Sequence, residues 1–292
     1  MRVLITGGDG QLGKSLRKII TENYNKYQSD DFTFTVRSDL DFSSMAKIDH
    51  YFSNNGKFDV IINCAAYTAV DMAEKERDIA KQVNCLAVKR LSEIANKCQS
   101  KLIHISTDYV FDGEDARPYS ESDPKSPVNF YGYTKLCADE AIQEVMPVNA
   151  VIVRSGWVFS EYGGNFVNTM LDLASKGCEI DVVDDQVGSP TYATDLAMVI
   201  LLIMHQMTSG KKTQVYHYSN SGKCSWYEFA REIFKTAGVD CKVNQILTKE
   251  YPTWAVRPKN TWLSKKKIMK EYDINLPTWK ESLKKCLLLI KT

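Results

Sequence analysis

The first half of the chain alternates short apolar runs with longer stretches in which apolar residues recur at helical spacing. The apolar or β-branched runs have the composition of buried strands, which we expect at residues 2–6, 32–36, 59–66, 101–107 and 150–155. The amphipathic stretches between them predict helices over residues 11–20, 74–98 and 131–145. Strands that alternate with helices are joined by right-handed crossovers. The pattern therefore predicts an α/β fold with a doubly wound parallel sheet.

The longest predicted helix covers residues 74–98. Its apolar residues fall on one stripe, made of Ile79, Val83, Leu86, Leu91 and Ile94. A stripe of this kind faces the core of a globular domain. We therefore expect all of these side chains to be buried against the sheet.

The pattern loosens after residue 156. Further helices are expected near 166–175, 195–207 and 225–238, and one more strand over 216–220. Gly238 is placed to close the third of these helices. The last fifty residues contain Pro252, Pro258 and Pro277, which predicts short, broken pieces there.

This change of pattern suggests two regions. We expect a dinucleotide-binding domain over residues 1–155 plus roughly 194–220. A smaller, irregular C-terminal substrate-binding region would comprise 156–193 plus 221–292. The length of 292 residues suits one large α/β domain with a smaller part attached.

Charge and composition argue against some classes of binding partner. The formal net charge is +1, with 37 basic and 36 acidic side chains, which argues against nucleic acid. The longest apolar run, over 198–204, is too short to span a bilayer. The chain opens directly on a predicted strand, so we expect a cytoplasmic protein with no membrane association. Its eight cysteines include no C-x-x-C pair and are expected to be reduced.

The stretch TGGDGQLG, residues 6–13, fits two phosphate-binding spacings. Gly8, Gly10 and Gly13 fit G-x-G-x-x-G, whereas Gly7, Gly10 and Gly13 fit G-x-x-G-x-x-G. The stretch follows a predicted strand and opens a predicted helix, which is the context of a Rossmann dinucleotide site. Backbone N–H groups at a helix N-terminus attract a pyrophosphate, and glycine allows the close approach.

The residues after the second strand bear on the choice of cofactor. An acidic residue there would bind the ribose 2′-hydroxyl of NAD. Here Arg37 and Ser38 follow the strand, and a guanidinium suits a 2′-phosphate. We therefore expect NADPH as the preferred cofactor, with NADH possible. Asp41 and Phe42, at what we expect to be the next strand end, would border the adenine.

The sequence YGYTK places Tyr131 and Lys135 four residues apart, on one face of a helix. A nearby ammonium favours the phenolate form of a tyrosine, so the pair suits proton transfer near neutral pH. Tyr133 is an alternative acid, but it lacks a lysine at that spacing. The stretch STDYVFDG follows the fourth strand, where Ser106 or Thr107 could donate a hydrogen bond to a substrate carbonyl. With these motifs in this order, the glycine spacing of Gly7, Gly10 and Gly13 is the better choice.

Together these motifs resemble those of the extended short-chain dehydrogenase/reductases, and among them the RmlD-like dTDP-4-dehydrorhamnose reductases. The motifs that carry the resemblance run over nearly the full length: GGDGQLG (7–13), NCAAYTAVDMAE (63–74), ISTDYVFDG (105–113), YGYTKLCADE (131–140), RSGWVF (154–159), VGSPTYATDLA (187–197) and RPKNTWLSKKKI (257–268). The resemblance implies that the C4 keto group of dTDP-6-deoxy-L-lyxo-4-hexulose is reduced by NAD(P)H to give dTDP-L-rhamnose.

The resemblance also implies roles for individual residues. Thr107 would hold the keto oxygen, Tyr131 would protonate it, and Lys135 would lower the tyrosine pKa and hold the nicotinamide ribose. The cofactor would be bound by Gly7, Gly10, Gln11, Leu12, Gly13, Arg37, Asp41, Phe42, Ala65, Ala66, Tyr67 and Lys135. The sugar nucleotide would be bordered by Val70, Asp108, Tyr109, Trp157 and Arg257. Trp157 could stack on a flat ring, and the Arg257 fork matches a diphosphate.

One position departs from the resemblance. Some reductases of this kind carry an acidic residue two positions after the last glycine, as part of a metal site between subunits, where this chain has Ser15. We therefore expect no metal, and a homodimer is possible but not of that metal-bridged kind. Two alternatives stay open: a reductase or epimerase of another nucleotide sugar, or a non-catalytic regulatory subunit like the β subunit of methionine adenosyltransferase.

Overall fold

The computed structural model describes residues 1–177 and 179–290. Its centre is a six-stranded sheet of order β10-β5-β4-β3-β1-β2, in which every pairing is parallel. Its strands are β1 (Arg2–Thr6), β2 (Asp31–Thr35), β3 (Val60–Asn63), β4 (Lys101–Thr107), β5 (Ala150–Ser155) and β10 (Gln214–His217). The strand order reverses between β1 and β3. The predicted doubly wound parallel sheet, with its sixth strand, is confirmed.

The strands are held in register by apolar residues and end in polar ones. Val3, Leu4 and Ile5 of β1 and Ile61 and Ile62 of β3 are at most 1% exposed. Both faces of these strands are covered, so the runs are continuously apolar rather than alternating. Polar residues stand at the carboxyl ends of four strands: Thr6, Asn63, Thr107 and Ser155. This edge of the sheet is where open α/β folds bind ligands.

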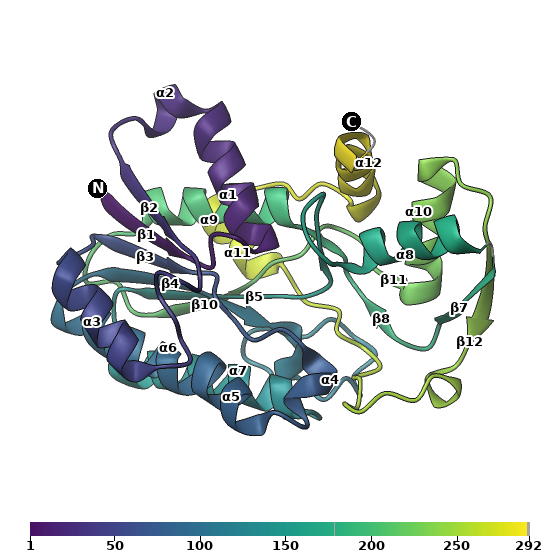
Figure 1. Ribbon diagram of the computed structural model, residues 1–292, viewed down its shortest axis with the longest axis horizontal. Helices are drawn as coiled ribbons and strands as arrows, with labels where there is room; N and C mark the ends of the chain where they lie inside the picture. Colours follow the sequence, from purple (N-terminus) through teal and green to yellow (C-terminus); the bar gives the residue numbers. More distant parts are fainter. Residues whose placement is uncertain (178, 291–292) are drawn as a thin grey trace.

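Two layers of helices cover the sheet (Figure 1). On one side α1 (Gln11–Glu22) and α9 (Ala193–Gln206) pack on each other and on β1, β3 and β5. On the other side lie α3 (Met45–Asn55), α6 (Ala87–Lys97) and α7 (Phe130–Val145). Short helices complete these layers: α2 (Tyr24–Tyr27), α4 (Val70–Ala73), α5 (Arg77–Lys81) and α11 (Lys266–Tyr272).

The helix predicted over 74–98 is confirmed over residues 77–97, but its regular apolar stripe is wrong. The segment forms α5, a π-helical turn over Gln82–Leu86, and then α6. A π turn holds one more residue than an α turn, so it shifts the phase of the apolar stripe. Asn84 and Cys85 are therefore buried, while Leu86 is 38% exposed instead of facing the core as expected.

The expected strand end at Asp41 and Phe42 is also wrong. The chain leaves β2 at Thr35 and passes through turns before α3, whose N-cap is Ser44. The Ser44 side chain accepts a hydrogen bond from the Lys47 backbone N–H, which fixes the start of that helix. Asp41 and Phe42 thus lie in the loop between β2 and α3.

The remaining elements gather beside one end of the sheet (Figure 1). They are β6 (Val158–Phe159), α8 (Phe166–Lys176), β7 (Glu179–Val183), β8 (Val187–Gly188), β9 (Thr191–Tyr192), β11 (Cys224–Ser225), α10 (Trp226–Ala237), β12 (Lys242–Ile246) and α12 (Trp279–Ile290). Helices α8, α10 and α12 share a separate apolar cluster with β7. Helix α10 begins at a capping box of Ser225 and Glu228, and it ends at the left-handed Gly238, as its sequence predicts for that glycine. The division into two regions itself stays a prediction.

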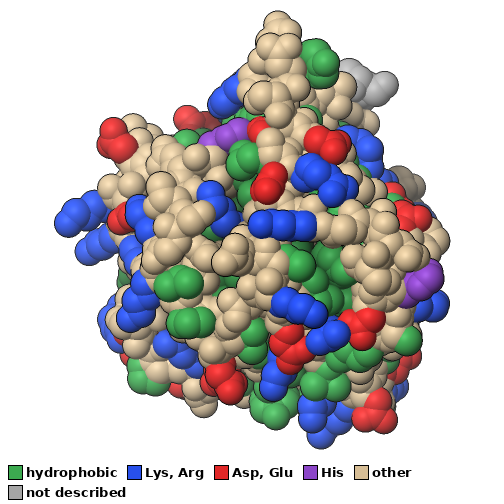
Figure 2. Space-filling model, turned by 90° about the vertical axis from the view of Figure 1, so that its left-hand side faces the viewer, with side chains coloured by type: hydrophobic (Ala, Val, Ile, Leu, Met, Phe, Trp, Pro, Cys, Tyr) green, Lys and Arg blue, Asp and Glu red, His purple; other side chains and the backbone are tan. Residues whose placement is uncertain are grey.

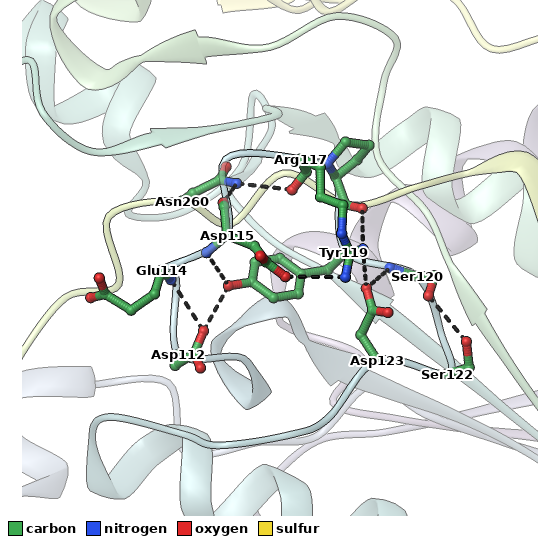
Figure 3. Close-up of polar contacts among 10 residues, drawn as sticks. Asp112, Glu114, Asp115, Arg117, Tyr119, Ser120, Ser122, Asp123 and Asn260 are labelled. Atoms are coloured by element: carbon green, nitrogen blue, oxygen red, sulfur yellow. Dashed lines mark hydrogen bonds and ion pairs between the residues drawn. The ribbon is translucent and has the colours of Figure 1, made fainter.

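The C-terminal segment is tied to the loop that follows β4 (Figure 3). The Tyr119 hydroxyl donates to Asp112 at 2.7 Å and accepts from the Asp115 backbone N–H at 3.1 Å. Asn260 donates to the backbone carbonyls of Asp115 and Arg117. The loop therefore fixes residues 257–264 beside STDYVFDG, although the two lie far apart in sequence.

The molecular surface carries both signs of charge. On the face shown in Figure 2, Lys and Arg side chains are interspersed with Asp and Glu. None of the helices in the described part of the chain has the length and apolar character of a bilayer-spanning segment. Cys85, Cys224 and Cys286 are buried free thiols, whereas Cys178 lies outside the described residues.

Candidate active site

One cavity of about 970 Å³ opens along the carboxyl edge of the sheet. It gathers the glycine loop after β1, the loops after β2 and β3, the end of β4, the start of α7 and the turn after β5. Every predicted catalytic, cofactor and sugar-nucleotide residue lines it, with the exception of Arg257. Residues that follow five different strands thus line the same cavity. The order of the motifs in the sequence suggests this arrangement but does not establish it.

The glycine loop favours one of the two spacings. Gly7 has φ of 68°, and a Cβ on it would lie 2.8 Å from the Ala65 backbone nitrogen. A Cβ on Gly13 would lie 2.4 Å from the Gly7 carbonyl oxygen. Gly8 has no positive φ, and its added Cβ would meet its neighbours at 3.3 Å. Gly7 and Gly13 therefore carry the tight contacts, which supports the spacing that begins at Gly7.

Helix α1 begins directly after this loop. Gly10 is its N-cap and makes no side-chain cap, and its first turn carries no acidic residue. The positive end of the helix dipole and its free N–H groups thus point toward the cavity without a competing carboxylate on the helix. Gln11 accepts a hydrogen bond from Ser160 at 2.8 Å, which ties the loop to the turn after β6.

The loop after β2 brings a cation and an anion to the wall of the cavity. The Arg37 side chain is 81% exposed, and its Nε lies 3.8 Å from Asp41. Asp41 accepts from Ser43 and, at 3.0 Å, from Lys47. Hydrogen bonds from Ser43 and Lys47 outweigh partial burial and lower the Asp41 pKa to about 2. Asp41 is thus a fixed anion, and the exposed guanidinium lies beside it without a close hydrogen bond.

The loop after β3 is held by a buried amide on the π turn. Asn84 accepts from the Tyr67 N–H at 2.8 Å and donates to the Tyr67 carbonyl at 3.0 Å. It also donates to Thr134 of α7 at 3.1 Å. The extra residue of the π turn points this amide inward. Sequence reasoning missed Asn84, because helical periodicity places it among polar surface positions.

Thr107 and Tyr131 meet where the catalytic chemistry was expected. Their hydroxyls share a hydrogen bond, and the Thr107 hydroxyl also contacts Asp108 at 3.1 Å and the Tyr109 N–H at 3.2 Å. Burial raises the pKa of Tyr131 to about 12. Tyr131 therefore carries its proton at neutral pH. Tyr133 is 45% exposed and does not line the cavity.

Lys135 is 2% exposed and lies at the floor of the cavity. Its Nζ is 2.6 Å from the Ile105 carbonyl oxygen and 3.2 Å from Nε2 of His104. Burial lowers its pKa to about 8. In this structure the Lys135 side chain is directed at β4. The expected lowering of the Tyr131 pKa is not found, because burial raises that pKa.

Asp108 is a buried carboxyl group in a tight setting. It is 2% exposed, and a Cβ on Gly156 would lie 2.0 Å from one of its oxygens. Burial raises the pKa of Asp108 to about 7, with a hydrogen bond from Thr107 opposing the rise. The group is thus able to donate or accept a hydrogen bond near neutral pH.

Aromatic side chains form the opposite wall. Tyr109 stands edge-on to Tyr131, with ring centroids 6.0 Å apart. Trp157 has φ of 52° and stacks on Trp226, with centroids 3.4 Å apart and planes within 3°. A Cβ on Gly188 would lie 2.6 Å from the Trp157 ring, so this glycine makes room for the indole. Trp226 was missed because its position at the start of α10 looks like an ordinary core position.

Arg257 lies outside the cavity lining. Its guanidinium donates to Asp71 at 2.6 Å and to the Ala255 carbonyl at 3.4 Å. A role toward a diphosphate would require the side chain to leave Asp71, and this role stays a proposal.

Ser15, which departs from the resemblance, is a fully buried residue of α1. Within residues 1–177 and 179–290, no group of three or more His, Cys, Asp or Glu side chains is arranged to hold an ion. The cavity instead offers a phosphate-binding loop, a protonated phenol, a hydroxyl beside it and a buried lysine. This set suits hydride transfer to a carbonyl with protonation of the oxygen.

The whole chain matches one protein family. The family described as RmlD substrate binding domain matches residues 1–291. The chain is 40% identical over 293 residues to dTDP-4-dehydrorhamnose reductase of Aggregatibacter actinomycetemcomitans, with 97% of each sequence covered.

Solved structures of similar fold agree. A dTDP-4-dehydrorhamnose reductase from Clostridium acetobutylicum superposes with a TM-score of 0.92 at 38% identity, covering 100% of both chains. The dTDP-4-dehydrorhamnose reductase from Bacillus anthracis str. Ames, solved in complex with NADP, gives a TM-score of 0.90 at 36% identity and covers 100% of this chain and 99% of its own.

Proposed function

The chain belongs to the family of the RmlD substrate binding domain, and from this membership we propose that it is an NADPH-dependent dTDP-4-dehydrorhamnose reductase. Its reaction is reduction of the C4 keto group of dTDP-6-deoxy-L-lyxo-4-hexulose to give dTDP-L-rhamnose. The observation that carries the proposal is the single cavity that unites the glycine loop, the Thr107–Tyr131 pair and Lys135.

Tyr131 is the proton donor of this reaction. A bound nicotinamide supplies the hydride to the carbonyl carbon. The Thr107 hydroxyl orients the keto oxygen, and the Tyr131 phenol gives that oxygen its proton. Its raised pKa keeps the proton available until negative charge develops on the substrate. Lys135 lies one helical turn away and stabilises the phenolate that is left.

The cofactor occupies the part of the cavity next to α1. The loop from Gly7 to Gly13 and the first N–H groups of α1 bind the pyrophosphate. Arg37 turns from Asp41 to a 2′-phosphate, which gives the preference for NADPH over NADH. Asp41 and Phe42 border the adenine, while Ala65, Ala66 and Tyr67 cover the cofactor from the β3 side. The bound NADP of the Bacillus anthracis relative supports this choice of cofactor.

The sugar nucleotide occupies the remaining space. Val70, Asp108, Tyr109 and Trp157 line it, and Trp226 backs the Trp157 ring. Asp108 binds sugar hydroxyls, and Arg257 reaches the diphosphate after it exchanges Asp71 for that anion. A cytoplasmic location suits a nucleotide-sugar substrate, and a homodimer stays a prediction.

A coupled assay tests the proposal. The purified protein is given NADPH and the 4-keto sugar, made in situ from dTDP-glucose by the preceding enzymes, and loss of nicotinamide absorbance is followed. We expect oxidation of NADPH with this substrate and much slower oxidation with UDP- or GDP-linked keto sugars. Preference for a UDP- or GDP-linked substrate would favour the alternative nucleotide-sugar enzyme. No oxidation with any keto sugar would favour the regulatory subunit.

A further inference from the structure

A buried chain of four polar side chains runs behind the cavity, through Thr6, Asn63, His104 and Lys135. Thr6 Oγ1 lies 2.6 Å from Asn63 Oδ1, and Asn63 Nδ2 lies 3.0 Å from His104 Nδ1. The other ring nitrogen, Nε2, is 3.2 Å from the Lys135 Nζ. All four side chains are 2% exposed or less. Polar groups this deeply buried must have their donors and acceptors matched.

The backbone fixes the orientation of the Asn63 amide. The Ala65 backbone N–H, which can only donate, points at Asn63 Oδ1 at 3.3 Å and shares its proton with Thr6 Oγ1. Oδ1 is therefore the acceptor, and the amide NH₂ faces His104. It follows that His104 Nδ1 accepts a hydrogen bond and carries no proton.

This assignment determines the tautomer of His104. Burial lowers the pKa of His104 well below its ordinary value, and Nδ1 carries no proton because it accepts from Asn63, so the ring is neutral. A neutral imidazole has one N–H, and with Nδ1 accepting, that N–H is on Nε2. The Nε2–H therefore points at the nitrogen of Lys135.

Only one protonation state of Lys135 matches this partner. An ammonium group has three donors and no lone pair, so it cannot accept from Nε2–H. A neutral amine can accept from His104 and still donate to the Ile105 carbonyl, 2.6 Å away. The two contacts together are satisfied only when Lys135 is an amine.

We infer that His104 is a positioning residue that holds Lys135 as a neutral amine in the unloaded site and releases it when it gains a proton. The inference rests on the proposed function, because it concerns the lysine that serves Tyr131. A charged Lys135 loses its partner at His104 and moves toward the cavity. There the phenolate left by Tyr131 attracts it, and the proton it gains comes from solvent in the open cavity.

Other charged and titratable groups face Lys135, and together with burial they set the pH range, above the Lys135 pKa, in which the amine predominates. Asp139, one turn further along α7, and Cys64, after β3, favour the charged form of Lys135. Asp139 is itself paired with Arg154 of β5 at 2.8 Å, which weakens its effect. Burial outweighs both groups and lowers the pKa of Lys135 to about 8.

Nuclear magnetic resonance tests the tautomer without any substrate. The protein is labelled with ¹⁵N in histidine, and a long-range proton–nitrogen correlation spectrum is recorded. The spectrum is simple to assign, because the chain has four histidines. His217 is an internal reference, because its Nδ1 faces the Tyr119 carbonyl at 3.1 Å and must carry the proton. We expect opposite tautomers, with Nδ1–H at His217 and Nε2–H at His104. An Nδ1–H tautomer or a doubly protonated ring at His104 would overturn the inference.

A pH titration of the same sample tests the link to Lys135. The His104 ring signals should move with a midpoint near the pKa of Lys135, about 8. They should not move in this range in a Lys135→Met variant. Signals that stay fixed in the wild-type protein between about pH 7 and pH 9.5 would contradict the inference.

A variant tests the consequence for turnover. His104→Phe removes the donor that favours the amine, so the Lys135 pKa should rise and the alkaline limb of the kcat profile should move to higher pH. The matched control is His217→Phe, since His217 is equally buried in the same sheet.

The two hypotheses fail in different ways. A uniform loss of activity at every pH in both histidine variants would show a structural role only, and would overturn the inference while the reductase assay still succeeds. A protein that reduces no keto sugar but shows the expected tautomer and its titration would overturn the proposed function alone.

Discussion

Tyr131 lines the cavity, whereas its neighbour Tyr133 does not. Tyr131 is partly buried, and desolvation raises its pKa to about 12, so it is protonated before the reaction. Tyr133 is 45% exposed on the other side of the same helix. The sequence could name both tyrosines, but only the fold decides which of them faces the cavity.

This difference gives a matched pair of variants. Tyr131→Phe should bind NADPH as tightly as the wild-type protein and lose turnover by about 10²- to 10⁴-fold, because the acid is gone and the ring remains. Tyr133→Phe should keep wild-type turnover. The measurements are steady-state kcat and cofactor affinity by fluorescence. Normal turnover in Tyr131→Phe would remove Tyr131 from the proposed mechanism.

Arg37 allows a test of cofactor choice. Arg37→Ala should weaken NADPH binding by about 10- to 100-fold and leave NADH binding nearly unchanged, because only NADPH carries the 2′-phosphate. Binding is measured by nicotinamide fluorescence. Arg90→Ala is the control, since Arg90 pairs with Asp49 and Glu93 away from the cavity. Equal losses for both cofactors would contradict the role of Arg37.

At the scale of elements, motifs that depend on backbone contacts were readable from sequence. The glycine loop, the capping box of α10 and the six parallel strands follow from local spacing and apolar runs. The π turn over Gln82–Leu86 was not readable, because it satisfies Asn84 through tertiary contacts with Tyr67 and Thr134. The loop that holds Asp41 and Phe42 was misread as a strand end, because the apolar residues Leu40 and Phe42 alternate with Asp41 as they would in a strand.

The glycine loop predicts a sharp difference between two glycines. In Gly13→Ala the new Cβ would lie 2.4 Å from the Gly7 carbonyl oxygen, so α1 must shift. We expect loss of cofactor binding and destabilisation by about 1–3 kcal/mol, measured by urea unfolding. Gly177→Ala is the control, because nothing lies within 4 Å of its added Cβ. If Gly13→Ala bound NADPH normally, the loop would not hold the pyrophosphate as proposed.

At the scale of the whole molecule, the substrate side was the least predictable part. Trp226 and Arg257 come from segments far from the catalytic residues in sequence, and their positions depend on how the C-terminal segment docks. Asn260 fixes that docking through contacts with Asp115 and Arg117, more than a hundred residues away in sequence (Figure 3). The backbone of Tyr119 also bonds to Trp262 and Ser264. A local sequence pattern does not show which distant segments pack together. Arg257 was therefore expected in a cavity that it does not line.

Buried histidines should make the fold sensitive to acid. Burial and the Arg154 charge lower the pKa of His217 to about 3, while an unfolded histidine has a pKa of about 6.5. Below the unfolded value, the unfolded chain binds a proton that the folded chain refuses, so this group removes about 1.4 kcal/mol of stability per pH unit as pH falls.

The variant His217→Phe isolates this effect. It should be less stable than the wild-type protein at pH 7, and the gap should narrow as the pH is lowered to about 5, because the variant lacks that proton uptake. Urea unfolding at several pH values measures the gap. A gap that stays constant over this range would contradict the account of His217.

The central claim is hydride transfer to C4 of a thymidine-linked 4-keto sugar, and the destination of the hydride tests it most directly. The protein is supplied with NADPH deuterated at the transferred position and with dTDP-6-deoxy-L-lyxo-4-hexulose, and the product is examined by mass spectrometry and proton resonance. We expect dTDP-L-rhamnose with one deuterium, located at C4, and no such product from Tyr131→Phe. A product without deuterium, deuterium at another carbon, or unchanged keto sugar would contradict the claim.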